Sequence, residues 1–221
     1  MASTLPFTRE MVVVHKVFRR EFGQASTWVG RVAPGDTAQA ALVYGHIQRH
    51  FDLLHHHHEA EDIHLWPLLR ERATDHAGLL DDMEAQHAGI DPALESAQAL
   101  GQRWTAGADV ESRDAFAEAL DEMVGPLMAH LDQEEADILP LAQKLLTQEE
   151  WDKLGEYAVA HTPKKDLLVG FGGVLEEASP DERTMMLGVL PAVPRVLYHL
   201  YGKRAYLKEA TAVRGTMPVG L

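Results

Sequence analysis

The chain has 221 residues, of which 46% are hydrophobic, a formal net charge of −14 and no cysteine. The apolar fraction is enough to form a core and excludes a wholly disordered chain, while the lack of cysteine excludes disulfides, iron–sulfur clusters and thiolate zinc sites. The negative charge argues against nucleic acid as a partner, because phosphate binding requires a basic surface.

The first helix is predicted to begin after Thr8, which can serve as its N-cap. Apolar residues then recur at three- to four-residue spacing, and one histidine falls on the same stripe. The stripe consists of Met11, His15, Phe18 and Phe22. Glycines and a proline between residues 30 and 35 predict the end of this helix. His15 is therefore expected to lie among core residues.

The second helix is predicted over residues 37–72, with a stripe that mixes apolar and metal-binding residue types. Its members are Val43, Ile47, His50, Leu54, His57, Glu61 and Leu65. Pro67 falls inside the pattern and removes a backbone hydrogen bond, which predicts a kink or an end there. Only one or two histidines of the run 55–58 can face inward, because successive residues point in different directions around a helix.

Two further helices are predicted, one starting at Thr74 and one over residues 111–146, with residues 101–107 as the loop between them. The inward stripe of the third helix consists of Leu79, Leu80, Met83, His87, Ile90 and Leu94. The inward stripe of the fourth consists of Phe116, Leu120, Met123, Leu127, His130, Glu134, Ile138 and Leu141. Pro126 and Pro140 interrupt the fourth helix.

Four long amphipathic helices with short connections predict an all-α, up-down four-helix bundle over residues 1–146. Capping boxes at Thr147–Glu150 and Ser179–Glu182 predict more helices beyond it. We therefore expect residues 147–221 to form a helical C-terminal extension that packs on the bundle. The five basic residues after residue 194, opposed by one acid, are expected to pair with the acidic bundle or to be solvated rather than to bind DNA.

The second and fourth helices carry the same pair, a histidine followed four residues later by a glutamate. Residues at this spacing lie about 40° apart around a helix and about 6 Å apart along it, so both side chains can reach one point. Imidazole with carboxylate suits a metal such as iron or manganese. Burying these groups without a metal would cost several kcal/mol. The candidate ligands are His15, His57, Glu61, His87, His130 and Glu134.

This order of residues, H…HxxxE…H…HxxxE over residues 8–146, resembles the hemerythrin-like (HHE cation-binding) family. The stretch HHHHEAEDIHLWPLL is similar to the second-helix motif of that family. The resemblance implies a non-heme centre of two iron ions with an oxo or hydroxo bridge, for which manganese or zinc could substitute. The four histidines would be terminal ligands, and Glu61 and Glu134 would bridge the two ions.

The chain departs from oxygen-carrying hemerythrins beside His87, because Met83 lies one turn before it and Asp91 one turn after it. The site therefore looks one histidine short. The groups considered for the vacant position are water, His50, Glu84, Asp91, His161 and a tyrosine. Family members with the HxxxE pair are associated with responses to oxygen, peroxide or nitric oxide. The resemblance thus implies handling of such a small molecule, either with catalase-like turnover or as a non-catalytic sensor of oxygen, iron or nitric oxide.

A ferritin-like di-iron oxidase is the other metal-containing alternative. It requires two Glu-x-x-His pairs on the second and fourth helices of its bundle. Here the pairs Glu61–His64 and Glu84–His87 fall on consecutive helices, which disfavours this interpretation.

The remaining histidines of the second helix are expected to have plainer roles. His46, His50 and His64 continue its stripe and are expected to form partly exposed polar surface, with a weak second metal site or a proton path as alternatives. Three others are expected to be solvated or to lie outside the ligand set: His55, His56 and His58. Two acids beside the glutamates of the site are expected to accept hydrogen bonds or to lie at the rim: Asp62 and Glu135.

Neither a signal peptide nor an apolar run of the roughly 18 residues that a membrane span requires is found in the sequence. A cytoplasmic protein is therefore expected, with a small-molecule ligand and without a nucleic acid or membrane partner.

Overall fold

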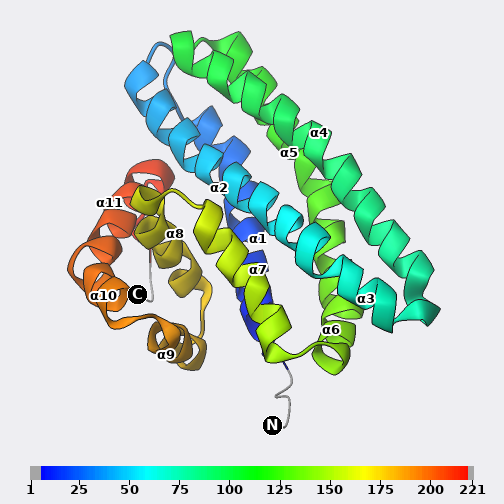
Figure 1. Ribbon diagram of the computed structural model, residues 1–221. Coiled ribbons are helices and arrows are strands. Elements are labelled where there is room, and N and C mark those ends of the chain that lie inside the picture. The colour runs from blue at the N-terminus through cyan, green and yellow to red at the C-terminus, as the bar shows by residue number, and fades with distance from the viewer. Residues whose placement is uncertain (1–5, 219–221) are drawn as a thin grey trace.

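The computed structural model describes residues 6–218, and within that range the secondary structure is helical. Its main body consists of four long helices, α1 (Arg9–Gly30), α2 (Thr37–His64), α4 (Ala77–Gly107) and α5 (Val110–Gln133). α1 packs against α2 and α5, and α4 packs against the same two helices, so the four form a closed bundle (Figure 1). The predicted all-α bundle is confirmed. No helix in the described range combines the length and hydropathy needed to cross a bilayer.

The chain breaks at Leu65, two residues before Pro67, as the sequence predicts. α2 ends at His64 and the short helix α3 (Trp66–Arg72) follows, with Pro67 in its first turn. Proline is tolerated there because the first N–H groups of a helix have no intrahelical partner. A single 3₁₀ turn, η1 (Thr74–His76), then leads into α4. After the break, α3 continues from the end of α2 and packs against α4 and α6 (Figure 1).

The loop predicted over residues 101–107 is wrong, because α4 continues through this segment to Gly107. Gly101 serves close packing rather than a turn. A Cβ atom at this position would overlap the rings of Tyr44 and Phe116. The side chain of Trp104 is fully buried, which fixes the segment against the core. The turn itself comes at Ala108, which adopts a left-handed conformation.

The fourth helix does not run regularly to its end. α5 passes into a π-helical segment, η2 (Glu134–Ile138), and then into α6 (Leu139–Leu145). Pro140 cannot donate a hydrogen bond to the preceding turn, and the N–H of Leu139 instead reaches the carbonyl of Glu134, five residues back. π-Helical turns within helices are frequently found at functional sites. The segment begins at one of the predicted ligands, Glu134.

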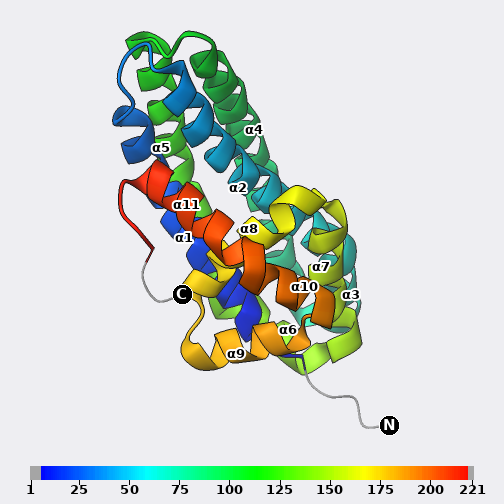
Figure 2. The same cartoon turned by 90° about the vertical axis from the view of Figure 1, so that its left-hand side faces the viewer.

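The C-terminal third is helical and covers one side of the bundle (Figures 1 and 2). Its elements are α7 (Gln148–His161), α8 (Lys164–Glu177), α9 (Pro180–Val189), α10 (Ala192–Leu197), the π-helical η3 (Tyr198–Gly202) and α11 (Lys203–Arg214). Both predicted capping boxes are present, at the start of α7 and of α9. α7 packs on α2, α8 on α1, and α11 on both α2 and α8.

The bundle core is divided into two apolar clusters. One contains Trp28, Trp104 and Phe116. The other contains Trp66 and Ile138 at the opposite end. Between the two clusters, each of the four long helical segments contributes polar residues to the interior. The apolar stripes of the four helices are therefore interrupted at the same position along the bundle axis.

Candidate metal centre

Seven buried histidine and glutamate side chains meet at the level between the two apolar clusters, and we call them the central cluster. The members are His15, His57, His58, Glu61, His87, His130 and Glu134. All are less than a tenth exposed, and Glu61 and Glu134 are fully buried. The cluster therefore contains all six ligands predicted from the sequence and one further histidine.

The donor atoms of the cluster form two groups. His15, His57 and Glu134 form one, His58, His87 and His130 form the other, and within each group the donor atoms lie within 4.8 Å of one another. Two glutamates connect the groups.

Glu61 reaches both groups through its two carboxylate oxygens. Oε1 lies 3.2 Å from Nε2 of His57, and Oε2 lies 3.4 Å from Nε2 of His87. Glu134 does the same through Oε2, which lies 3.2 Å from Nε2 of His15 and 3.9 Å from Nε2 of His130. This arrangement can hold two cations with two shared carboxylates.

The donor set fits metal ions, because its buried polar atoms lack other partners. Within the described residues, both carboxylate oxygens of Glu61 and of Glu134 have no hydrogen bond, and neither has Nε2 of His87, of His130 or of His58. Unpartnered buried polar atoms are destabilising and rare in native proteins. Neighbouring ligands about 2.1 Å from one metal and at right angles to each other are about 3 Å apart. The separations of 3.2 to 3.4 Å are close to that value.

Three of the histidines are held by hydrogen bonds from the ring nitrogen that points away from the cluster. Nδ1 of His15 lies 2.9 Å from Oε1 of Glu135, and Nδ1 of His87 lies 2.9 Å from Oδ1 of Asp62. Nδ1 of His130 lies 3.1 Å from Oε1 of Gln86. Metal-bound histidines characteristically donate their second N–H in this way, which fixes the tautomer that leaves Nε2 free to bind.

The acceptors are themselves fixed by neighbouring donors. Arg19 donates to Glu135 over 2.6 Å, and the indole of Trp66 donates to Asp62 over 2.8 Å. The expectation that Asp62 and Glu135 accept hydrogen bonds is confirmed. Both acids follow the shared glutamates directly in the sequence, so each helix supplies a carboxylate and a hydrogen-bond acceptor from adjacent positions.

The electrostatics of the cluster are mixed. Although burial opposes it, Glu134 raises the pKa of His15 to about 9, and Asp62 with Glu61 raises the pKa of His87 to about 10, whereas the charged forms of other members are disfavoured. Burial and repulsion from Glu134 raise the pKa of Glu61 to about 8. Burial and the neighbouring His15 hold the pKa of His57 well below its usual range, and burial with His87 does the same for the pKa of His58. Cations at the centre would favour both the ionised carboxylates and the neutral imidazoles, which are the forms that bind metal.

A scan against family models matches residues 7–142 to the hemerythrin HHE cation-binding domain. The chain belongs to this family. Comparisons with curated proteins and with solved structures find no match. As a hemerythrin HHE domain, the bundle is a metal-binding module of a kind that typically takes iron, and its buried histidine–glutamate groups agree with that role.

His58 is the residue of this hemerythrin domain's cluster for which the sequence predicts either a solvated position or one outside the ligand set. A solvated position is wrong, because its side chain is only 2% exposed and its donor atoms lie with those of His87 and His130. Its ring stacks on that of His87, with 4.0 Å between the centroids. The position beside His87 that looked vacant is therefore occupied by a histidine from α2 rather than α4. The prediction that only one or two histidines of the run 55–58 face inward is confirmed, since His55 is exposed and His56 is only partly buried.

Of the other candidates for this position, Asp91 lies close to it, with Oδ1 3.7 Å from Nδ1 of His58, and two more lie farther away. His161 is exposed and bonds to the carbonyl of Tyr157. Glu84 pairs with Arg70 at the surface. His64, which a ferritin-like site would use, lies against Tyr157 and outside the central cluster.

A second buried group of histidines and acids lies further along α1 and α2, and we call it the Glu21 network. Nε2 of His46 lies 2.7 Å from Oε2 of Glu21, and Nδ1 of His46 lies 2.8 Å from Oε1 of Glu209 on α11. Arg20 and Arg214 both donate to Oε1 of Glu21. The expectation of partly exposed polar surface is wrong for His46, which is 2% exposed because α11 covers it. Arg214 bears out the predicted pairing of the basic C-terminal segment with the bundle.

A polar opening lies on the outer side of His87. It has a volume of about 380 Å³, and its wall includes Asp62, Glu84 and Asp91 beside His87. His87 is the one member of the central cluster that lines it.

Proposed function

We propose that the bundle holds two iron ions and uses them to handle a small oxidant, with hydrogen peroxide as the principal candidate. The ligands would be His15, His57, Glu61, His87, His130 and Glu134, as the sequence predicts, with His58 as a seventh. Glu61 and Glu134 would bridge the ions. The observation that carries the proposal is the set of buried donor atoms in the described residues that have no hydrogen bond, on Glu61, Glu134, His58, His87 and His130, beside the Nε2 atoms of His15 and His57, which lie 3.3 Å from each other.

The two histidine groups support a near-symmetric pair of ions. With two carboxylates shared, seven protein ligands leave coordination positions open for a small molecule. The polar opening beside His87 suits hydrogen peroxide, oxygen or nitric oxide by size and polarity. When bound, two iron ions would supply one electron each to cleave one peroxide into two waters, and would regain both electrons from a second peroxide that leaves as oxygen.

The chain itself would orient the ligands and provide for proton movement. Glu135, Asp62 and Gln86 would keep three imidazoles in the metal-binding tautomer. Cleavage of one peroxide consumes two protons and oxidation of the second releases two. Asp62 and Asp91 line the opening and can carry these protons between the centre and solvent.

We further propose that residues 1–146 form the metal-binding domain and residues 147–221 a covering extension, and that the protein acts in the cytoplasm. The chemistry proposed for the site depends neither on this domain boundary nor on the cellular location.

Metal analysis with an absorption spectrum tests the proposal. Protein purified from iron-replete cells should carry about two iron ions per chain and show oxo-to-iron charge-transfer bands in the near ultraviolet. A stably folded, metal-free protein from such cells would overturn it. Oxygen evolution from hydrogen peroxide, with and without metal, then separates turnover from non-catalytic binding.

His58→Leu tests the seventh ligand against a matched neighbour. The variant should lose one of the two iron ions, because one histidine group would keep only His87 and His130. His55→Leu makes the same change at an exposed position three residues earlier and should keep both ions. Equal iron content in the two variants would remove His58 from the ligand set.

A further inference from the structure

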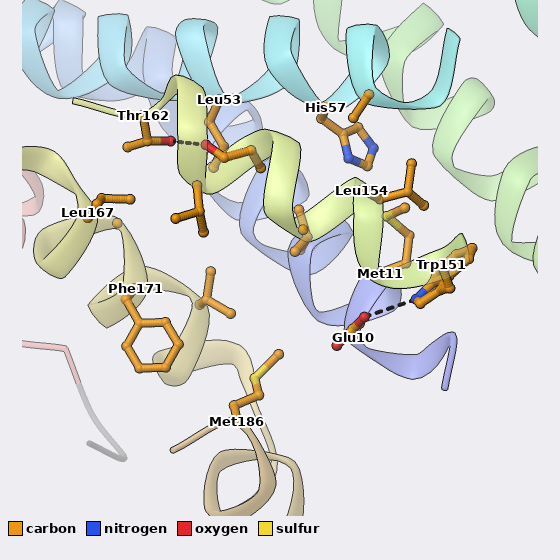
Figure 3. Close-up of a pocket in the computed structure, with 17 residues that line it drawn as sticks. Glu10, Met11, Leu53, His57, Trp151, Leu154, Thr162, Leu167, Phe171 and Met186 are labelled. Atoms are coloured by element: carbon orange, nitrogen blue, oxygen red, sulfur yellow. Dashed lines mark hydrogen bonds between the residues drawn. The ribbon is translucent and has the colours of Figure 1, made fainter. Parts of the chain in front are cut away.

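An apolar cavity lies between the bundle and the C-terminal extension (Figure 3). Its volume is about 310 Å³. α1 and α2 form one wall, and α7, α8 and α9 form the other. The wall is almost entirely apolar, with Leu53, Leu154, Phe171 and Met186 among its residues.

The cavity reaches the central cluster through His57. Figure 3 shows this ring extending from α2 toward Met11 and Leu154. Nε2 of His57 faces the cluster, at 3.2 Å from Glu61. The opposite edge of the same ring therefore belongs to the cavity wall, so one side chain separates the two sites.

His57 differs from the other three predicted histidine ligands in its second ring nitrogen. His15, His87 and His130 each direct Nδ1 to an oxygen acceptor. Nδ1 of His57 has no hydrogen-bond partner within residues 6–218 and is not among the fully buried unpartnered atoms, so it remains accessible at the edge of the ring that lines the cavity. If Nε2 binds metal, Nδ1 must carry a proton, and that N–H then points into an apolar cavity without an acceptor.

We propose that this cavity is a binding site for a small, uncharged, apolar organic molecule with one oxygen acceptor, such as a ketone or aldehyde. Its hydrocarbon part fills the space between α2, α7 and α8. Its carbonyl oxygen accepts the hydrogen bond of His57 Nδ1 and completes the pattern seen at the other three histidines. The orientation of the carbonyl rests on the proposed metal at Nε2, whereas the cavity and its lining do not.

The other polar groups of the wall favour a neutral ligand. Glu10 accepts a hydrogen bond from the indole of Trp151, and burial raises the pKa of its carboxyl group. The hydroxyl of Thr162 is used by the carbonyl of Ala158. A carboxylate ligand would place a second acid near Glu10 in an apolar wall, which is costly. A neutral carbonyl needs only the one free donor.

The volume sets the size of the ligand. An apolar cavity of about 150 Å³ accommodates one benzene molecule, so a space of about 310 Å³ is suited to a two-ring compound or a medium-length alkyl chain. 2-Acetylnaphthalene, with two rings and one carbonyl, is therefore a suitable probe.

Competition with the apolar fluorophore N-phenyl-1-naphthylamine, with the full-length protein, tests the site. 2-Acetylnaphthalene should displace the dye, and 2-naphthoate, which has the same rings and a charged head, should bind at least tenfold more weakly. Equal affinity for the two compounds, or no displacement by the ketone, would overturn the proposal.

Two variants test the location of the ligand. Gly170 lines the cavity and has open space around an added Cβ, so Gly170→Leu should fill the cavity and weaken ketone binding at least tenfold. Ala158→Leu fills it from α7 and should have the same effect. Gly23→Leu, an exposed helical glycine with equally open surroundings, is the matched control and should bind as the wild type does. Unchanged binding in both cavity variants would exclude this location.

The infrared carbonyl stretch of the bound ketone tests the contact with His57. It should be lowered relative to its value in a hydrocarbon solvent, and His57→Phe, which keeps a ring of similar size, should remove the shift. A carbonyl without a shift in the wild type would overturn the contact. Iron content is measured on the same samples. If the purified protein contains no iron but still binds the ketone, and Gly170→Leu abolishes this binding, the cavity site stands and the proposed metal function is refuted.

Discussion

The central cluster and the Glu21 network both bury histidines and glutamates and share the helices α1 and α2, but their charges are balanced differently. Glu21 receives hydrogen bonds from Arg20, Arg214 and His46. Glu61 and Glu134, in the described part of the chain, face only histidines and have no hydrogen bond. In the network, positive charge comes from arginine side chains. In the cluster, the chain supplies only imidazoles, of which His15 and His87 have raised pKa values, and bound cations would take over this role.

This difference shows why composition and burial alone do not identify a metal site. Glu21, His46 and His50 have donor atoms close enough to hold an ion. Both ring nitrogens of His46 are nevertheless already used, by Glu21 and Glu209. Satisfied hydrogen bonds indicate a structural network, and unsatisfied donor atoms indicate a ligand that the chain does not supply. The contrast leads to substitutions with opposite expected effects in the two regions.

The largest effect is expected from removing a shared carboxylate. Glu61→Ala should reduce the iron content from about two ions per chain to one or none, because this side chain contacts both histidine groups. Glu134→Ala should act in the same direction. Mass spectrometry of the purified variants measures the iron. Both variants with a full complement of iron would refute the bridging role.

Glu21→Gln is expected to lower the stability of the fold without changing the iron content. This change removes one charged partner of Arg214 and of Arg20, which both keep Glu176. Breaking a buried ion pair completely typically destabilises a protein by about 3–5 kcal/mol, so a smaller loss than that is expected. Urea unfolding measures the loss. The iron content should stay at the wild-type value, and a loss of iron with unchanged unfolding would mean that the network, rather than the cluster, binds metal.

A smaller effect is expected from the residues that orient the ligands. Asp62→Ala removes the acceptor of His87 Nδ1, and loss of such a partner typically weakens metal binding about 10- to 100-fold. Competition with a chelator measures the affinity. Asp82→Ala, at an exposed position of α4, is the control. Identical affinities for the two variants would mean that the hydrogen bond to His87 does not support the site.

The smallest effect concerns acid sensitivity in the Glu21 network. Burial is the main factor that lowers the pKa of His50 to about 3, with Glu21 opposing the shift and His46 and Arg20 adding to it. The unfolded chain therefore binds a proton at His50 below about pH 6.5 that the folded chain does not, so stability falls as the pH falls from 6.5 toward 3.

Urea unfolding between pH 7 and 5 measures this contribution. The slope attributable to His50 is at most about 1.4 kcal/mol per pH unit, and His50→Gln should remove it. His55→Gln controls for the loss of an imidazole. Glu21, whose pKa is held well below its usual range although burial opposes this, adds its own loss only below about pH 4.5. A slope unchanged in His50→Gln would contradict the prediction.

Helical periodicity was sufficient to predict the bundle and the candidate ligands on its four stripes. His15, His57, His87 and His130 each replace an apolar residue at a position where the spacing requires burial, and all four are buried. Helical periodicity gives a wrong prediction where a residue packs against side chains of other helices. Gly101 was interpreted as a loop because glycine often ends helices, but its neighbours are Tyr44 and Phe116 on other helices.

The sequence by itself determined the all-α class, the family and the positions of histidine and glutamate one turn apart, because these depend on contacts within single helices. Only the tertiary structure decided the role of His58. α2 lies between α1 and α4, so two of its faces are interior, and adjacent residues about 100° apart point into different histidine groups. The same packing decides which histidines meet arginines and which are left with unpartnered nitrogen atoms. Those partners come from distant parts of the chain, as Arg214 shows, and no local pattern encodes them.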